Sequence, residues 1–564
     1  MPEVHVQIDG RELTVPHTFT VLQAAERAGI GVPKLCAHPA LAPIGACRIC
    51  LVEIEKQRVL QPACTFPVSE GMVVHTNSPK VRDARRFVLE LLFSERNHFC
   101  MFCEMSGSCE LQSLAYEYGL DHWEYDRAFP RLGVDASRKF FVMDHNRCIL
   151  CRRCIRACDS LVGNQTLGIK NRGAQSMIVA DMDVPFGQSS CVSCGTCLQV
   201  CPTGALFDRA SAYMGATEEI TRVKSRCVGC SVGCGVEWII RQNRLIRIEG
   251  DWDAKPNNGL LCEMGRFAPL HETRQRVRTP LVKSANGFEE TDWDHAASMV
   301  ADKIKAAGDK LAVVVSGFAT TEAAQAIVTG LPGHKSLADG AAPAGAGACL
   351  SVLDEADLYI VVNTDVAKLF PVASFAIKRG MRSRGARLII LDDAETSLDG
   401  WAACKYESTA VAKAVELAAG AQMPAIVYGA AGASVAAQMA KALPTSKTVA
   451  FAPGGNTLGL AGAGITAAAP RKDARCFYVM ANEMAQPSSD LLTALAQADF
   501  VAVQACFREP WQSIADVILP TPTTYEKSGT ITNAEGRTLA LQAGTQPDAK
   551  SEVAVIQLIS SLTS

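Results

Sequence analysis

The placement of its cysteines constrains this chain more than any other feature of the sequence. Nineteen of the 23 cysteines lie between Cys36 and Cys262, most of them two or three residues apart. Disulfide scaffolds are short secreted chains, whereas this chain has 564 residues and does not begin with a basic segment followed by an apolar run. The pattern therefore predicts that these nineteen are metal ligands. The other four are isolated, and we expect them to be small buried apolar residues: Cys349, Cys404, Cys476 and Cys506.

Length and charge limit the classes of protein that remain. A chain of 564 residues exceeds one hydrophobic core, so we expect roughly three to five domains. Its 55 basic and 58 acidic residues are well mixed and give a formal charge of -3, which favours neither nucleic acid nor an anionic membrane as a partner. No stretch reaches the roughly 18 uninterrupted apolar residues of a membrane span. These observations predict a soluble cytoplasmic chain, attached to the inner membrane only through partners if at all.

The first half of the sequence predicts small elements around the cysteines. Residues 4–8 and 12–15 form a hairpin across Asp9-Gly10, and a helix runs from the Thr20 cap to Gly29. Residues 80–96 have the period of an amphipathic helix. We expect short loop-helix units around two cysteine runs in 140–212, which are the one internal repeat, and a strand pair at 236–250.

After residue 277 the composition changes to Ala, Gly and Val. Short apolar strands alternate there with helical stretches, which predicts parallel β-α-β units in one or two doubly wound layers. The strands are expected at 311–315, 358–362, 387–391, 448–452, 476–480 and 500–504. Two glycine-rich segments, 428–434 and 453–459, lack the G-x-G-x-x-G fingerprint with a following acidic residue, so we interpret them as turns. No flavin or NAD site is predicted on this chain.

The first cysteine group is Cys36, Cys47, Cys50 and Cys64, with 10, 2 and 13 residues between its members. Four thiolates on a glycine-bearing loop suit a 2Fe-2S cluster, with loop N-H groups pointing at the sulfurs. The spacing alone leaves zinc open. The preceding hairpin and helix favour the 2Fe-2S interpretation.

The second group contains three cysteines and a histidine: His98, Cys100, Cys103 and Cys109. A 4Fe-4S cluster needs a fourth ligand and no spare cysteine lies nearby, so a neutral imidazole is expected to take that place and raise the potential. His98 is the preferred ligand, with His122 and His145 as alternatives.

Two cysteine runs share the spacing of two-cluster ferredoxins, in which the fourth cysteine of each run ligates the other cluster. The first run ends in Asp159 where the second ends in Pro202. One 4Fe-4S cluster is therefore expected on Cys148, Cys151, Cys154 and Cys201. The other is expected on Cys191, Cys194, Cys197 and Cys158.

The fifth group is Cys227, Cys230, Cys234 and Cys262, with 2, 3 and 27 residues between its members. A structural zinc site can have this spacing, so the ligand pattern by itself leaves zinc open beside a 4Fe-4S cluster. The α/β region that follows favours the cluster.

Longer motifs carry a resemblance to known families. Residues 1–215 resemble the small diaphorase iron-sulfur subunit of NAD-reducing hydrogenases and the front of the large, G-type iron-sulfur subunit of respiratory complex I, through GACRICLVE and NHFCMFCEMSGSCELQ. From Cys227 on, the chain is similar to the molybdopterin oxidoreductase fold that complex I retains without molybdenum. CVGCSVGC, LLCEMGRF, TDWDHAASMVADKI and ADVILPTPTTYEKSGTITNAEGR carry this second match.

The resemblance implies a multidomain α+β and α/β fold. In chain order it implies a β-grasp 2Fe-2S ferredoxin domain, a His/Cys3 cluster segment, a two-cubane ferredoxin domain, a 4Fe-4S domain of the molybdopterin-oxidoreductase type, and a degenerate α/β domain with Rossmann-like layers. The expected bounds are 1–78, 79–120, 138–215, 220–276 and 277–564.

The sequence departs from these families at four places. Only Phe99 separates His98 from Cys100, whereas complex I subunits usually have three residues there. Met264 takes the position of the lysine that carries electrons to the pterin in molybdenum enzymes. The segment 330–347, where a molybdenum ligand is expected, is short, and the chain ends soon after Arg537. We therefore expect no molybdopterin, and structural roles for Glu526 and Lys527.

The resemblance implies an electron-transfer subunit with one 2Fe-2S and four 4Fe-4S clusters and no catalytic site of its own. It would relay single electrons between an FMN-containing, NADH-binding flavoprotein and a further catalytic or membrane-linked redox subunit, with a small 2Fe-2S subunit as another partner. The complex would be of the complex I, hydrogenase or formate dehydrogenase type. Alternatives are a molybdenum- or tungsten-dependent formate dehydrogenase, an iron-iron hydrogenase and a redox sensor. The last four cysteines are too isolated for the hydrogenase, and a sensor has little use for five clusters.

Overall fold

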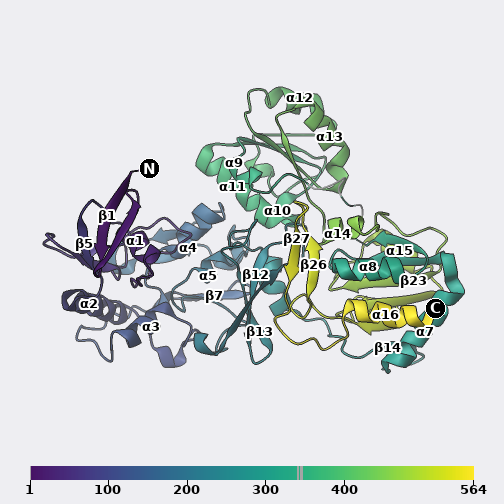
Figure 1. Cartoon of the computed structure of the whole chain (residues 1–564), viewed down its shortest axis with the longest axis horizontal. Coiled ribbons are helices and arrows are strands. Elements are labelled where there is room, and N and C mark those ends of the chain that lie inside the picture. Colours follow the sequence, from purple (N-terminus) through teal and green to yellow (C-terminus); the bar gives the residue numbers. More distant parts are fainter. Residues whose placement is uncertain (1, 339–341, 343–346, 564) are drawn as a thin grey trace. The chain divides into compact units, whose positions relative to one another are not determined.

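The computed structural model describes residues 2–338, 342 and 347–563 (Figure 1). The chain divides into two compact units, Met1–Ile220 and Thr221–Ser564. None of the helices in the described part is both long and apolar enough to cross a membrane.

The first unit begins with a five-stranded β-grasp sheet in the order β2-β1-β5-β3-β4. Its strands are β1 (Glu3–Ile8), β2 (Arg11–Pro16), β3 (Leu51–Ile54), β4 (Gln61–Pro62) and β5 (Met72–His75). Strand β1 lies between β2, to which it is antiparallel, and the central strand β5, to which it is parallel. Helix α1 (Val21–Arg27) begins at a capping box between Thr20 and Gln23, because each side chain satisfies the other's free backbone N-H. The predicted hairpin and helix are confirmed.

The rest of the first unit consists of short elements that carry the cysteine loops. Helix α2 (Pro79–Glu95) begins at Ser78, whose side chain accepts from the Val81 N-H, and confirms the predicted amphipathic helix. The cysteine runs contain the short helices α4 and α5, and α4 continues into a π-helical turn at Ala157–Leu161. The other elements are α3 (Glu110–Glu117), α4 (Arg153–Arg156), α5 (Thr196–Gln199), the three-stranded sheet β10-β7-β6 (Leu206–Asp208, Phe141–Asp144, Val134–Asp135) and the hairpin β8 (Leu167–Lys170) and β9 (Met177–Ala180).

The second unit opens with a three-stranded antiparallel sheet, β11 (Thr221–Arg226), β12 (Gly235–Arg241) and β13 (Arg244–Gly250). The predicted strand pair is β12 and β13, and β11 was not predicted because it lacks an apolar run. Helix α6 (Glu263–Phe267) follows and starts at Cys262.

A seven-stranded sheet forms the larger α/β layer, in the order β15-β14-β25-β24-β23-β16-β17. Five of its strands are parallel, and β14 and β15 form an antiparallel edge. Alternate residues of β16 enter two cores: Val313 packs with α7, α8 and α16, while Val314 packs with α15 on the opposite face. The elements are β14 (Leu281–Ser284), β15 (Gly287–Glu290), α7 (Trp293–Ala307), β16 (Leu311–Val315), α8 (Thr321–Gly330), β17 (His334–Leu337), β23 (Cys476–Asn482), α15 (Ser489–Leu495), β24 (Phe500–Ala505), β25 (Val517–Pro520) and α16 (Glu552–Thr563).

A second, five-stranded sheet is entirely parallel, in the order β20-β19-β18-β21-β22. Its strands are nearly continuous apolar runs because helices cover a parallel sheet on both faces. The elements are β18 (Leu358–Val362), α11 (Pro371–Arg384), β19 (Arg387–Leu391), β20 (Cys404–Tyr406), α12 (Val411–Leu417), β21 (Pro424–Tyr428), α13 (Ala433–Ala442) and β22 (Lys447–Ala450). The predicted parallel β-α-β units are therefore confirmed and form two layers, although β22 ends two residues earlier than expected.

The two glycine-rich segments are close-packed turns. A Cβ atom on Gly432 would lie 2.4 Å from the carbonyl oxygen of Val362, and one on Gly455 would lie 2.7 Å from the Val228 Cα. Contact with neighbouring backbone thus explains these glycines. Part of the short segment 330–347 lies outside the described residues.

Candidate metal centres

The first cysteine group lies on the loop after α1 and around β3 and β4. The backbone N-H of Cys36 donates to the Cys47 sulfur at 3.3 Å, and the Cys47 N-H donates to the Cys36 sulfur at 3.4 Å. Hydrogen bonds with Cys47 and Cys64 lower the pKa of Cys36, and one with Cys64 lowers the pKa of Cys50. The structure therefore brings all four predicted residues together, with loop N-H groups directed at sulfur.

The second group lines a single cavity that contains His98, Cys100, Cys103 and Cys109. The Nε2 atom of His98 is buried and has no hydrogen-bond partner among the described residues. Burial, with the nearby charges of Arg147 and Arg96, lowers the pKa of His98 to about 3, so the imidazole is neutral. A buried neutral imidazole with a free nitrogen is suited to binding a metal.

The two alternative histidines lie elsewhere. His122 is exposed, and its Nδ1 atom lies 2.7 Å from the Asp121 carboxylate. His145 is buried in the turn before Cys148 and does not line the cavity of the second group.

The two ferredoxin-type runs exchange their fourth cysteines. Cys158 lines one cavity with Cys191, Cys194 and Cys197 of the other run. Burial and the neighbouring Cys201 raise the pKa of Cys151, which places Cys201 beside the first run. The structure thus brings together the two sets that the spacing predicts.

Both runs contain the same unusual backbone turn. Leu150 and Ser193 occupy equivalent positions with φ values of 52° and 51°. The left-handed conformation is costly for residues other than glycine, and here it directs the N-H of Leu150 to the Cys148 sulfur and that of Ser193 to the Cys191 sulfur, each at 3.4 Å. The sequence did not predict these donors. Only glycine favours a left-handed backbone strongly enough to be recognised in a sequence, and neither Leu150 nor Ser193 is a glycine.

The fifth group lies at the start of the second unit. Gly229 donates its N-H to the Cys227 sulfur at 3.5 Å, and Gly265 donates to the Cys262 sulfur at 3.4 Å. Burial and the neighbouring Cys262 raise the pKa of Cys227 to about 12. The side chain of Met264 is 65% exposed.

Within the described residues, no three His, Cys, Asp or Glu side chains converge in a way that would hold a single metal ion. An iron-sulfur cluster makes a different demand, because its protein ligands bind separate iron atoms around an inorganic core. Cavities lined by three or four ligands satisfy that demand.

The isolated cysteines are only partly as predicted. Cys476 and Cys506 are buried, Cys404 is half-buried, and Cys349 is exposed. The prediction is wrong for Cys349 because this residue lies in a loop, where its thiol contacts the Glu535 carboxylate at 3.1 Å.

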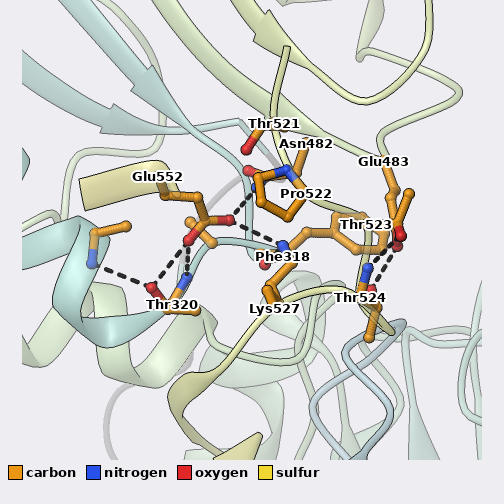
Figure 2. A network of polar contacts seen from close by, with 12 residues as sticks. Phe318, Thr320, Asn482, Glu483, Thr521, Pro522, Thr523, Thr524, Lys527 and Glu552 are labelled. Atoms are coloured by element: carbon orange, nitrogen blue, oxygen red, sulfur yellow. Dashed lines mark hydrogen bonds and ion pairs between the residues drawn. The ribbon is translucent and has the colours of Figure 1, made fainter. Parts of the chain in front are cut away.

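A buried polar network lies at the carboxyl edge of the seven-stranded sheet, where doubly wound folds place ligands. Figure 2 shows Glu552 between Thr320, Asn482 and Lys527. Burial would lower the pKa of Lys527, but Glu552 and Glu483 raise it, so the ammonium is charged. Glu526 pairs with Arg276 at 2.7 Å. Glu526 and Lys527 thus have the structural contacts expected of them. The sequence analysis did not identify Glu552.

Models of known families match consecutive parts of the chain. Residues 1–79 match "2Fe-2S iron-sulfur cluster binding domain", and 85–123 match "NADH-ubiquinone oxidoreductase-G iron-sulfur binding region". Residues 139–207 match "NADH-quinone oxidoreductase subunit 3, ferredoxin-like domain", and 220–272 match "Molybdopterin oxidoreductase Fe4S4 domain". The model "Molybdopterin oxidoreductase" matches 276–426 and 429–561, half of the chain. The chain belongs to the molybdopterin oxidoreductase family.

Known proteins resemble this molybdopterin oxidoreductase family member to different extents. "NADH-quinone oxidoreductase subunit 3" of Thermus thermophilus is 29% identical over 95% of this chain and 80% of that protein. Another NADH-quinone oxidoreductase protein, from Rhizobium meliloti, is 33% identical over 55% of this chain, which spans only 36% of that protein. A chain in the crystal structure of an NAD+-reducing [NiFe]-hydrogenase in the H2-reduced state is 36% identical and has a TM-score of 0.36. The match covers 38% of this chain and 90% of that chain.

Proposed function

We propose that the chain is an iron-sulfur electron-transfer subunit of a multisubunit, NAD(H)-linked oxidoreductase. The observation that carries the proposal is the gathering of nineteen cysteines and His98 into five separate groups, four in the first unit and one in the second. The first group would hold a 2Fe-2S cluster and each of the others a 4Fe-4S cluster. When bound, these clusters accept and donate single electrons at low cost.

The shared cavities and neighbouring thiols described above support the ligand sets that we propose. Each set is given with the cluster that it would hold. They are Cys36, Cys47, Cys50 and Cys64 for the 2Fe-2S cluster, and, for the 4Fe-4S clusters, His98, Cys100, Cys103 and Cys109; Cys148, Cys151, Cys154 and Cys201; Cys191, Cys194, Cys197 and Cys158; and Cys227, Cys230, Cys234 and Cys262.

The protein around these groups supports fast electron transfer by excluding water. One apolar core packs Cys36 and Cys151 with Leu89 and Leu111, and Cys100 and Cys109 pack against it. A dry, rigid environment reduces the rearrangement that accompanies a change of charge. The backbone N-H groups directed at sulfur stabilise the added negative charge, which raises the potential.

We further propose that the chain holds no molybdopterin. Met264 offers no amine next to the fifth group, and its side chain is exposed. At the carboxyl edge of the seven-stranded sheet, two basic groups are paired with carboxylates, Lys527 with Glu552 and Arg276 with Glu526. Acid extraction followed by pterin fluorescence tests this proposal, and a stoichiometric signal would favour a formate dehydrogenase-type catalytic subunit instead.

The partners proposed are an FMN-containing, NADH-binding flavoprotein, a small 2Fe-2S subunit and a further catalytic or membrane-linked redox subunit. The match to iron-sulfur regions of NADH-quinone oxidoreductase subunits supports this assignment. Anaerobic metal analysis tests the cluster content, because one 2Fe-2S and four 4Fe-4S clusters contain about 18 iron atoms per chain. A content of about 14 iron atoms per chain would mean that one 4Fe-4S cluster is absent. Stoichiometric zinc would assign the fifth group to zinc.

A further inference from the structure

Two arginines of the one-turn helix α4 connect three of the cysteine groups. Arg153 is buried and forms a bidentate pair with Glu110, the residue after Cys109, at 2.7 and 2.9 Å. It also donates to the carbonyl oxygen of Ala37 at 2.7 Å and to that of Val200 at 3.3 Å. These acceptors adjoin ligands of the second, first and third groups.

Arg156 makes a more direct connection. Its Nη2 atom donates to the carbonyl oxygens of Cys36 at 2.5 Å and of Cys151 at 3.5 Å, so that one guanidinium contacts the backbone of ligands from two groups. It also donates to the carbonyl oxygens of Ala42 and Arg152. All these acceptors are uncharged, and Arg156 forms no ion pair with any residue that the structure describes.

The surroundings leave the charge of Arg156 uncompensated. The Arg153 charge is offset by the Glu110 carboxylate. The first and third groups therefore share one half-buried cation that no carboxylate of the described residues neutralises.

Reduction adds an electron to a cluster that its four thiolates already make negative. A fixed cation beside the cluster stabilises the reduced form more than the oxidised form, and partial burial weakens the screening of this attraction. On the basis of the function proposed above, we infer that Arg156 is a positioning residue that joins the first and third clusters and raises both of their potentials together.

The test compares three substitutions in the full chain with all clusters loaded. Redox titrations followed by electron paramagnetic resonance measure the potential of each cluster. Arg156→Gln should lower the potentials of the first and third clusters and leave that of the second unchanged. Arg156→Lys keeps the charge and should restore most of the shift. Arg152→Gln is the matched control, because Arg152 directly precedes the same helix but is exposed, and it should change neither potential.

Unchanged potentials in a fully loaded Arg156→Gln chain would overturn the inference, as would an equal shift in Arg152→Gln. If Arg156→Gln fails to load the first cluster, Arg156→Lys decides: potentials close to those of the unaltered chain support the inference, and low potentials refute it. Absence of a 2Fe-2S signal from the unaltered chain would instead refute the proposed function, and the inference with it.

Discussion

At the scale of single residues, the buried Nε2 atom of His98 gives the most specific test of the second ligand set. His98→Ala should lose or destabilise the second cluster alone, because no other histidine or cysteine lines that cavity with Cys100, Cys103 and Cys109 among the described residues. His98→Cys should keep a 4Fe-4S cluster at a lower potential, because a thiolate adds negative charge. Iron content and redox titration measure both effects. Unchanged spectra and potentials in both variants would transfer the ligand role to another residue.

Buried thiols make the stability of the metal-free chain depend on pH. Burial raises the pKa of Cys109 and Cys227 to about 12, above the value of about 8.5 in an unfolded chain. Between roughly pH 9 and 11 the unfolded chain therefore releases protons that the folded chain retains. Stability should fall as pH rises through this window, by about 1.4 kcal/mol per thiol and pH unit.

Denaturation of the reduced, metal-free chain at pH 8 and pH 10 measures this loss. The loaded chain should lack the thiol contribution, because its thiolates are already bound to iron. Cys227→Ser is a useful comparison, because a hydroxyl does not titrate in this range. The dependence of stability on pH should therefore lose the contribution of one thiol. Equal slopes in the loaded and metal-free chains would contradict the assignment of these thiols as ligands.

At this scale the sequence predicted which cysteines the fold brings together, but not which side chains surround them. Spacing alone indicated the exchange of Cys158 and Cys201, because the two-two-three pattern has one efficient solution. It did not indicate Arg153, Arg156 or Glu110, whose partners lie on other segments of the chain. Contacts at large sequence separation, mostly to main-chain oxygens, leave no local pattern to recognise.

At the scale of elements, Glu552 fixes the start of α16 to the carboxyl edge of the seven-stranded sheet. Its pair with Lys527 is almost fully buried, at 4% side-chain exposure on both sides. Lys527→Met leaves an unpaired buried carboxylate and should destabilise the second unit by about 3–5 kcal/mol. The double substitution Lys527→Met with Glu552→Gln should cost clearly less than the sum of the two single changes.

The free energy of unfolding of the second unit, measured from its transition in urea, gives these losses. Lys405→Met is the matched control, because the Lys405–Asp399 pair is about 30% exposed on both sides and should contribute under about 1 kcal/mol. A loss no larger for Lys527→Met than for Lys405→Met would show that the buried pair does not anchor α16.

The sequence predicted six of the parallel strands, including the edge strand β22, but missed the inner strands β21 and β25 and most of the edge strands. β16, β18 and β19 are buried on both faces, so they appear as apolar runs. The edge strand β15 contains exposed glutamates and gave no such run. Edge strands are polar because solvent contacts them, and their pairing is decided by the rest of the fold.

At the scale of the whole molecule, the proposed function predicts that the chain uses NADH only together with a partner. Single-electron centres cannot accept a hydride as two separate electrons, since that step is the chemistry of a flavin. The purified chain should therefore not oxidise NADH. Adding an FMN-containing flavoprotein similar to the NADH-binding subunit of complex I should let NADH bleach the cluster absorbance.

We expect electrons to arrive through residues 1–215, because this part carries the match to iron-sulfur regions of NADH-quinone oxidoreductase subunits. The α/β layers of the second unit would then act as a docking platform. Deleting residues 1–215 should abolish reduction by NADH and flavoprotein while dithionite still reduces the fifth cluster, which controls for folding of the remaining unit. Rapid bleaching of the flavin-free chain by NADH would refute the relay. Equal reduction by the flavoprotein after the deletion would refute this route. Electrons would then reach the fifth cluster in a chain that lacks all ligands of the first four clusters.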